Sequence, residues 1–274
     1  MSSNEDRARA LADRVRRDYE LDDAPINDLF ELVYRACGID VMSMDAGQDE
    51  HGLTMCHPTT GFLIIAVATT PHPMRQRSSI AHELGHVLAG DLDAGVTLTP
   101  GSRTPEEIRA DAFARHLLIP LDGVRRRVAK LDGPLTQAHL SDLVQRFEVS
   151  PAMAAIQLRT LGKISQDTCT EWSSDSASRL AARFGWADQY RALAVTSQAP
   201  RAPQGLMSRA VEGYRRGVLS VAELAHWYGQ SPADLESELG PPVPVDDADA
   251  WNDDDDEWDP SAPLFPDTNS EGGP

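Results

Sequence analysis

The chain has 274 residues, of which 41% are hydrophobic and 25% are charged, as in ordinary soluble proteins. Its longest apolar run, residues 62–68, is far shorter than the roughly 20 residues that a membrane-spanning helix requires. The N-terminal residues are charged throughout and lack the apolar stretch of a secretion signal. The 3 cysteines are widely spaced and do not suggest a disulfide framework. These features predict a cytoplasmic protein without a membrane association.

The net charge of −18 is concentrated near the C-terminus. Eleven acidic residues and no Lys or Arg lie between Asp246 and Glu271, and without these eleven the net charge of the chain is −7. The body of the protein is therefore not a basic nucleic-acid binder by bulk charge. Residues 241–274 are acidic, rich in Pro and poor in apolar side chains, which predicts a disordered tail. Interleaved aromatic residues such as Trp251 and Phe265 leave two roles open, solubility or recruitment of a partner.

Helical periodicity and stop signals predict the elements of the N-terminal half. Two amphipathic helices are expected first, followed by three strands, and then by two helices that a loop over residues 90–104 separates. The second of these helices begins at Thr104-Pro105, an N-cap followed by proline, and ends before Pro120. The expected helices cover residues 5–19, 26–37, about 75–89 and 105–118, and the expected strands cover Ile39–Met42, Gly52–Cys56 and Gly61–Val67.

The rest of the chain, as far as residue 240, predicts short helices without strands. Residues 140–158 and 221–239 resemble each other at an offset of 81, and each has an apolar helix, a tight turn, and a serine N-cap before proline. This is the outline of a helix-turn-helix. Acidic side chains in the second outline and only Arg159 and Lys163 in the first favour packing or protein contact over specific DNA binding. Residues 196–205 are expected to link the two regions.

The strongest chemical signal is His82-Glu83-Leu84-Gly85-His86, an HEXXH motif. Histidines four residues apart share one face of a helix, so their imidazoles can bind one metal ion. Glu83 is one position further round the helix, where its carboxylate can act as general base toward water on a zinc ion. The motif predicts a zinc site with His82 and His86 as ligands and Glu83 as the catalytic residue. A surface helix with two incidental histidines is the alternative.

A catalytic zinc ion needs a third protein ligand and one open coordination position. The metzincin pattern does not fit, because Ala89 and Leu92 stand where glycine and a third ligand are required, and Asp91 is out of register by one residue. Glu107 and Asp111 form an ExxAD pattern on the next helix, so Glu107 can bind zinc while Asp111 orients a ligand histidine. Glu107 also completes a capping box with Thr104, which is a purely structural alternative.

The segments SSIAHELGHVLAGD and EEIRADAFARHLLIP together resemble the ImmA/IrrE family of metallopeptidases. The resemblance covers about residues 20–165 and extends to the helix-turn-helix-like stretch LVQRFEVSPAMAAIQLRTLG. It implies a zincin-like fold with His82, His86 and Glu107 as metal ligands and Glu83 as the catalytic residue. It also implies cleavage of a helix-turn-helix repressor, often one that controls mobile-element or stress-response genes.

We therefore expect an α+β protein with a zincin-like metallopeptidase core and a small sheet (residues 1–120). A helix-turn-helix-like region (121–165), a helical C-terminal region (166–240) and the acidic tail (241–274) are expected to follow. The predicted function is zinc-dependent cleavage of a cytoplasmic regulatory protein. Two alternative functions are a non-catalytic protein that senses metal or partners and a toxin-like peptidase. For Cys56, at the end of a predicted strand, a small core residue is favoured over a position at the cleft.

Overall fold

The computed structural model describes residues 3–46, 52–57, 59–91, 104–129, 131 and 133–242. These residues form helices and one three-stranded sheet, which fits the expected α+β class. None of the described helices is long and apolar enough to cross a membrane. The expected acidic tail lies outside the described residues from position 243 onward, and the domain boundaries expected at 120, 165 and 240 stay predictions.

The chain divides into two compact units, which are described separately. The first contains Met1–Met55 and Leu63–Arg201, and the second contains Cys56–Phe62 and Ala202–Pro274. The HEXXH motif and the helix that carries Glu107 both belong to the first unit. The first unit therefore contains every residue that the sequence predicts for the metal centre.

The sheet of the first unit has the strand order β1-β3-β2. β1 (Asp40–Met44) runs parallel to β3 (Leu63–Ala68), with Asp40 opposite Ile64 and Met44 opposite Ala68. The apolar run of β3 is buried at its centre, as expected for a middle strand. β2 (Gly52–Cys56) is an outer strand, and its Leu53 side chain is 59% exposed. The sheet therefore presents β2 as one of its edges.

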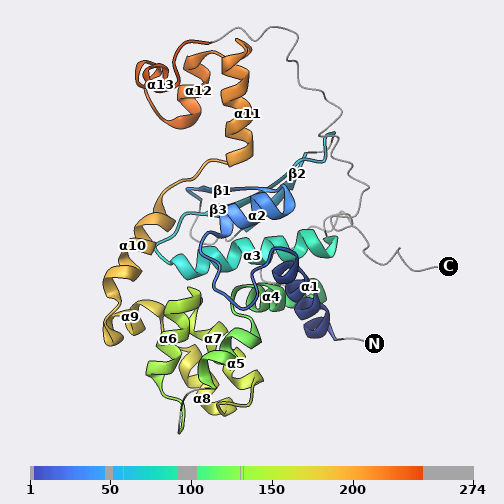
Figure 1. Cartoon of the computed structure of the whole chain (residues 1–274), viewed down its shortest axis with the longest axis vertical. Coiled ribbons are helices and arrows are strands. Elements are labelled where there is room, and N and C mark those ends of the chain that lie inside the picture. The colour runs from blue at the N-terminus through green and yellow to red at the C-terminus, as the bar shows by residue number, and fades with distance from the viewer. Residues whose placement is uncertain are drawn as a thin grey trace, which may run out of the picture. The chain divides into compact units, whose positions relative to one another are not determined.

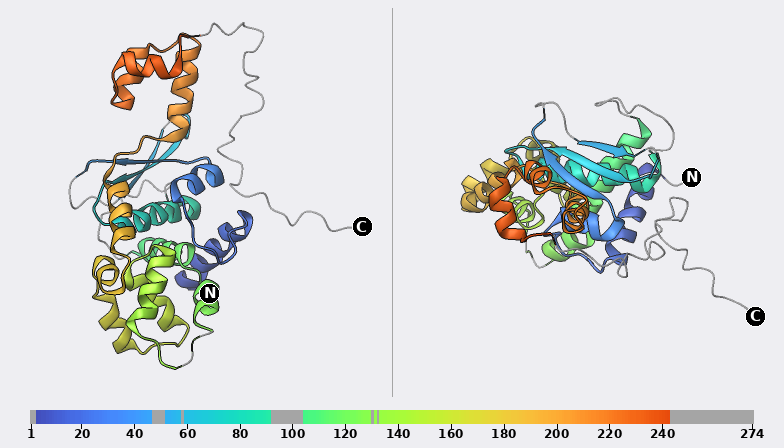
Figure 2. Two further views of the ribbon diagram at one scale, coloured as in Figure 1. Left: turned by 60° about the vertical axis from the view of Figure 1, so that its left-hand side comes forward. Right: turned by 90° about the horizontal axis from the view of Figure 1, so that it is seen from above.

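Four helices pack in layers beside this sheet, and two of them, α3 and α4, carry the candidate site: α1 (Asn4–Asp18), α2 (Leu29–Cys37), α3 (Pro73–Ala89) and α4 (Pro105–Leu118). α3 packs against β3 on one side and against α4 on the other, and α1 packs against α4 (Figures 1 and 2). α4 begins where the sequence predicts, since the Thr104 side chain caps it and proline follows. α3 ends at Gly90, whose φ of 73° suits a residue without a side chain.

Small residues allow α3 and α4 to approach each other closely. Ala110 and Ala114 on α4 are each 1% exposed. A Cβ atom placed on Gly85 of α3 would lie 2.9 Å from Cδ1 of Phe113 and 3.3 Å from the Cα atom of Ala110. The glycine of the HEXXH motif therefore sets the spacing between the helix of the histidines and the helix of Glu107.

Arg16 of α1 connects three parts of the first unit from a buried position, with 3% of the residue exposed. Its Nε–H group donates to the carbonyl oxygen of Asp22 at 2.8 Å, and its other guanidinium N–H groups donate to the carbonyl oxygens of Ala24 and Leu117. Leu117 is in the last turn of α4. The N-terminal helix is thus tied by hydrogen bonds to the helix that carries Glu107.

The first unit continues as short helices: α5 (Leu121–Val128), α6 (Gln137–Phe147), α7 (Pro151–Thr160), α8 (Gln166–Ser173), α9 (Ala177–Phe184) and α10 (Ala187–Gln198). Backbone hydrogen bonds between Ser43 of β1 and Arg201 join the end of this region to the sheet. The connection after α10 begins at residue 199, so the linker expected from residue 196 is in part helical.

The second unit contains α11 (Gln204–Arg215), α12 (Val221–Tyr228) and α13 (Pro232–Leu239). Its small core contains Tyr214, Leu224 and Leu235. Ser231 caps α13 with proline at the next position, as Ser150 and Pro151 do for α7. Both helix pairs with the expected caps are present, while their role as helix-turn-helix modules stays a prediction.

Candidate metal centre

Two histidines of α3 form the centre of the candidate site. His82 and His86 are one helical turn apart, and their Nε2 atoms lie 3.1 Å from each other. The His86 side chain is 1% exposed, whereas that of His82 is 20% exposed. The first histidine faces the solvent side of the site and the second is enclosed, so the pair can bind a ligand that enters from outside.

Glu107 of α4 completes a group of three. Its Oε2 atom lies 3.2 Å from His82 Nε2, and its Oε1 atom lies 3.5 Å from His86 Nε2. One donor atom from each of the three residues lies within 4.8 Å of the others. The helix cap uses only the backbone of Glu107, whose N–H donates to Thr104 Oγ1 at 3.3 Å. The carboxylate is thus directed to the histidines, and capping and metal binding do not compete for it.

The outer nitrogens of both histidines contact carboxylates. His82 Nδ1 lies 2.9 Å from Asp111 Oδ1, and His86 Nδ1 lies 2.9 Å from Asp91 Oδ2. Each carboxylate is placed to accept a hydrogen bond from Nδ1–H, and in a neutral imidazole this leaves the lone pair on Nε2. In that form two Nε2 lone pairs and the Glu107 carboxylate face one another, and a cation between them would be stabilised by all three. The donor set therefore fits a metal ion.

The carboxylates around His82 favour positive charge at this position. Burial by itself would lower the pKa of His82, but the hydrogen bond to Asp111 and the negative charges of Asp111, Glu107 and Glu83 outweigh it. The pKa of His82 is therefore raised, because the surrounding carboxylates stabilise positive charge at this position. A metal cation bound by the Nε2 atom benefits from the same carboxylates.

Asp91 is a site residue that the sequence does not predict. The metzincin spacing places a ligand one residue later, so Asp91 has no role in that pattern. In the structure the turn at Gly90 returns the chain toward the helix end, and the Asp91 side chain is 8% exposed beside His86. Its second oxygen forms an ion pair with Arg109 of α4. An acidic residue directly after a helix-ending glycine is the local signal that could have indicated it.

Glu83 lies beside the group and contacts β2. Thr54 Oγ1 donates a hydrogen bond to Glu83 Oε2 at 2.8 Å. Gly52 lies close to the same side chain, since a Cβ atom there would be 3.0 Å from both Cγ and Oε1 of Glu83. The carboxylate of the predicted general base is therefore located where the outer strand of the sheet meets α3.

Two further residues lie apart from this group. His116 is buried on α4, with Nε2 2.8 Å from Glu5 Oε1, so it is outside the metal group. The prediction that Cys56 is a small core residue is wrong, because this cysteine is exposed. It is the last residue of the outer strand β2, where the sheet covers a side chain least.

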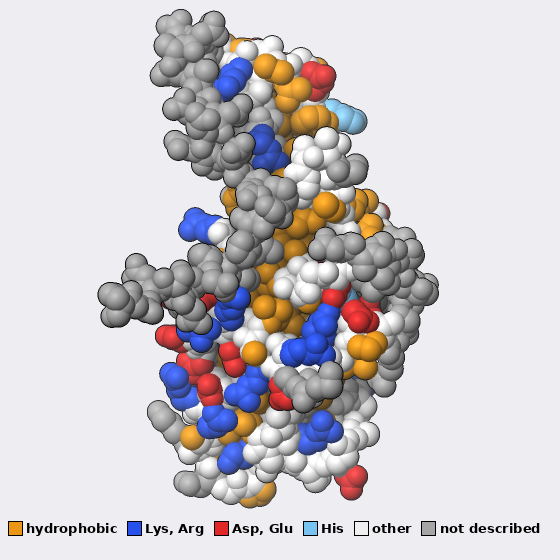
Figure 3. All heavy atoms as spheres, turned by 90° about the vertical axis from the view of Figure 1, so that its right-hand side faces the viewer, with side chains coloured by type: hydrophobic (Ala, Val, Ile, Leu, Met, Phe, Trp, Pro, Cys, Tyr) orange, Lys and Arg blue, Asp and Glu red, His pale blue; other side chains and the backbone are white. Residues whose placement is uncertain are grey.

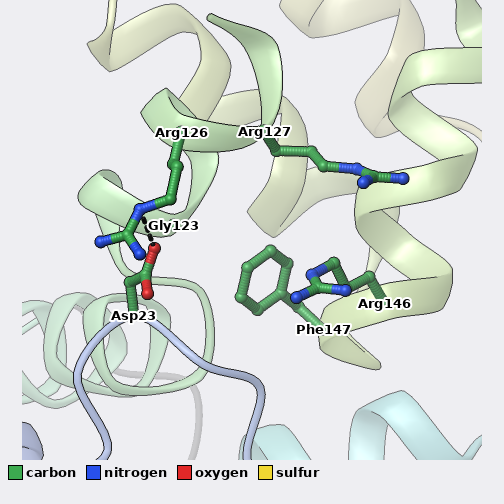
Figure 4. Close-up of a pocket in the computed structure, with 6 residues that line it drawn as sticks. All are labelled: Asp23, Gly123, Arg126, Arg127, Arg146 and Phe147. Atoms are coloured by element: carbon green, nitrogen blue, oxygen red, sulfur yellow. Dashed lines mark ion pairs between the residues drawn. The ribbon is translucent and has the colours of Figure 1, made fainter. Parts of the chain in front are cut away.

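A hollow of about 200 Å³ lies between α5, α6 and the segment before α2 (Figure 4). Asp23 forms an ion pair with Arg126 at 2.8 Å. The ring of Phe147 points into the hollow, and a Cβ atom on Gly123 would lie 2.9 Å from both this ring and the backbone oxygen of Asp23. None of the lining residues belongs to the metal group; they are Asp23, Gly123, Arg126, Arg127, Arg146 and Phe147.

Comparison with known proteins agrees with the geometry of the site. A search of curated proteins found no match. Residues 35–159 match the peptidase M78 family, described as an IrrE N-terminal-like domain, and this segment contains the HEXXH motif, Glu107 and Asp111. The match confirms the resemblance to the ImmA/IrrE family and implies a peptidase of the metal-dependent type. Residues 35–159 are thus similar to the peptidase M78, IrrE N-terminal-like, family.

Proposed function

We propose that this protein is a zinc-dependent endopeptidase that hydrolyses a peptide bond in a cytoplasmic regulatory protein. The observation that carries this proposal is the convergence of His82, His86 and Glu107 within 4.8 Å, with Glu83 on the same helix as the histidines. Two histidines and one carboxylate are a donor set that zinc peptidases use, and a tetrahedral ion would keep one position open.

The residues of the chain have separate tasks in this mechanism. His82, His86 and Glu107 would hold the ion, which supplies Lewis-acid activation of water and of the substrate carbonyl. Glu83 accepts the proton of the attacking water and then transfers it to the nitrogen of the leaving amine. Asp111 and Asp91 keep the two imidazoles in the tautomer and orientation that the ion requires.

The proposed substrate is a helix-turn-helix repressor of the XRE type. The support is the family itself, for which the sequence resemblance implies cleavage of such repressors. A site on the surface edge of a sheet also suits an extended segment of a protein substrate. The acidic residues 246–271, which lie outside the described residues, would attract the basic DNA-binding face of a repressor.

Specific DNA binding by the protein itself is not part of the proposal. α13 carries Asp234, Glu236 and Glu238, which would repel phosphate groups. Arg159 of α7 already donates to the side-chain oxygen of Gln166, the first residue of α8. On the face shown in Figure 3, acidic and basic side chains are intermixed, in contrast to the uniform basic surface that binds DNA.

The test is co-expression with helix-turn-helix regulators encoded beside the gene, followed by mass spectrometry for a new fragment. Wild-type protein should cleave the regulator into two fragments and bind about one zinc ion per chain. Glu83→Gln should bind the same amount of zinc without producing the fragments, and His82→Ala should lose both. Cleavage by Glu83→Gln at the wild-type rate would overturn the assignment of the general base.

A protein that senses metal without turnover is the competing function. It predicts that wild-type protein binds zinc and the regulator, while the regulator remains intact. Mixing the purified zinc-loaded protein with the regulator separates the two functions, since only a peptidase yields two products whose masses sum to the substrate plus one water.

A further inference from the structure

Two residues of the outer strand β2 lie beside the side chain of Glu83. Gly52 and Thr54 are two positions apart and so face the same side of the strand. Leu53 and Met55 face the other side, where they are 59% and 41% exposed. The strand therefore directs its smallest residue and its hydroxyl-bearing residue at Glu83, and directs its large apolar residues away from it.

The hydrogen bond from Thr54 restricts the rotation of the Glu83 carboxylate. Its hydroxyl is 2.8 Å from Oε2, so it engages one carboxylate oxygen and leaves Oε1 without this hydrogen bond. A hydrogen bond to an ionised acceptor is stronger than one between neutral groups. Thr54 is thus able to select a single orientation of a flexible side chain.

Gly52 complements this contact through space alone. Its φ is not positive, so the backbone does not require glycine. A Cβ atom at this position would lie 3.0 Å from Cγ and from Oε1 of Glu83, and 3.3 Å from Cδ. These atoms belong to a movable side chain, so a substitution would displace the carboxylate and not the strand.

We propose that β2 positions the general base: Thr54 is a positioning residue that orients the Glu83 carboxylate, and Gly52 provides the space that this orientation needs. The proposal rests on the proposed function and adds a reason for the presence of this strand at the metal centre. Neither residue contacts the metal ligands in this role or takes part in the proton transfer.

The contact itself is tested in the metal-free protein by a double-mutant cycle on urea unfolding. Thr54→Val removes the hydroxyl at constant shape, Glu83→Ala removes the acceptor, and the third variant carries both. If the hydrogen bond is present, the shift of the midpoint in the double variant should be smaller than the sum of the two single shifts. Additive shifts would overturn the proposal, whether or not the protein is a peptidase.

The consequence is tested on cleavage of the repressor identified by co-expression. Thr54→Val should lower kcat by roughly 10- to 100-fold, the equivalent of one hydrogen bond to a charged group, without a change in KM or zinc content. Thr54→Ser retains the hydroxyl and should recover most of the rate. Gly52→Ala should lower kcat while its urea midpoint remains that of the wild type.

The outcomes separate this proposal from the proposed function. If the wild type cleaves and Thr54→Val cleaves equally fast, the positioning role is wrong and the peptidase assignment stands. If the wild type cleaves no repressor while the double-mutant cycle shows coupling, the peptidase assignment is wrong and the contact between β2 and Glu83 is supported. An equal loss of rate in Thr54→Ser and Thr54→Val would also overturn the role of the hydroxyl.

Discussion

Asp91 and His86 are joined by a 2.9 Å contact across the turn at Gly90, at the end of the helix that carries the HEXXH motif. His82 has a corresponding partner in Asp111, which comes from α4. The two carboxylates differ in environment, since the Asp91 side chain is 8% exposed and that of Asp111 is 73% exposed. Water competes for the second contact far more than for the first.

We predict that Asp91→Asn weakens metal binding more than Asp111→Asn does. Removal of an outer carboxylate at a ligand histidine costs roughly 10- to 100-fold in metal affinity, and we expect Asp91 near the upper end. Competition with a fluorescent zinc chelator at neutral pH measures both affinities. A larger loss for the exposed Asp111 would contradict the argument from burial.

Arg109 requires a control, because Asp91→Asn also removes the ion partner of this partly buried arginine. Arg109→Gln in the presence of Asp91 keeps the carboxylate on His86 and removes only the ion pair. It should reduce metal affinity less than Asp91→Asn. If both variants lose affinity equally, Asp91 acts through the pairing of the two helices and not through His86.

Substitutions at Glu107 and Thr104 should separate metal binding from helix capping. Glu107→Gln should lower metal affinity strongly, because a neutral amide is a poor zinc ligand, while the stability of the metal-free protein changes little. Thr104→Ala should do the reverse, with a loss of about 1 kcal/mol in the free energy of unfolding. Zinc titration and urea unfolding of both variants test the pair, and a Glu107→Gln protein with wild-type zinc affinity would refute the ligand assignment.

Gly85 is predicted to be essential for the spacing of α3 and α4. Alanine is the better helix former by roughly 1 kcal/mol, but its Cβ atom would meet Phe113 at 2.9 Å. Overpacking of this kind costs about 1–3 kcal/mol, so Gly85→Ala should destabilise the protein and weaken zinc binding together. Phe113→Leu supplies the reference background. Without the Phe113 ring, Gly85→Ala should lower the free energy of unfolding by less than it does in the wild type. Greater stability of Gly85→Ala than of the wild type would show that the helices can separate freely.

The lowered pKa values of His116 and Glu5 predict a loss of stability as the pH falls. Burial lowers the pKa of His116, with Arg115 and Arg9 adding to the effect and Glu5 opposing it. The unfolded chain therefore takes up a proton near the ordinary pKa of 6.5 while the folded protein does not, so stability decreases from about this pH downward.

The pKa of Glu5 is also lowered, because Arg115 and His116 together outweigh the burial that would raise it. Its contribution is present above the ordinary value of 4.5 and is lost as the pH falls through its lower folded pKa. Urea unfolding between pH 7.5 and 4 measures both steps. His116→Gln should remove the upper step and keep the lower one, and an unchanged pH profile in this variant would contradict the assignment.

Local sequence signals were sufficient where a single segment determines the structure. Thr104-Pro105 marks the observed start of α4, and the four-residue spacing of His82 and His86 places both imidazoles on one face. The sequence favours Glu107 as the third metal ligand but leaves open that this residue only caps the helix. The direction of its carboxylate distinguishes the two roles, and the sequence does not determine that direction.

Contacts that depend on tertiary packing could not be predicted from the same signals. Thr54 reaches Glu83 only because β2 is the outer strand beside α3, and no periodicity within residues 52–56 encodes that neighbour. Cys56 was expected in the core because a lone cysteine in a strand is most often a small core residue, whereas it is exposed at the end of the outer strand β2. The helix that apolar periodicity predicts from residue 26 begins at Leu29, because the Asp28 side chain caps it. The cap residue is a local signal that gives the observed start better than the periodicity does.

The hydrogen bonds of the Arg16 guanidinium indicate where the folded domain begins along the chain. The family pattern begins at residue 35, yet the carbonyl oxygen of Leu117 and the buried face of α4 depend on a helix that ends at residue 18. A fragment that contains only residues 35–159 would include all the candidate metal ligands and lack α1, which packs against α4. We therefore expect that a fragment must include α1 to fold around the metal ligands, although α1 lies outside the matched residues.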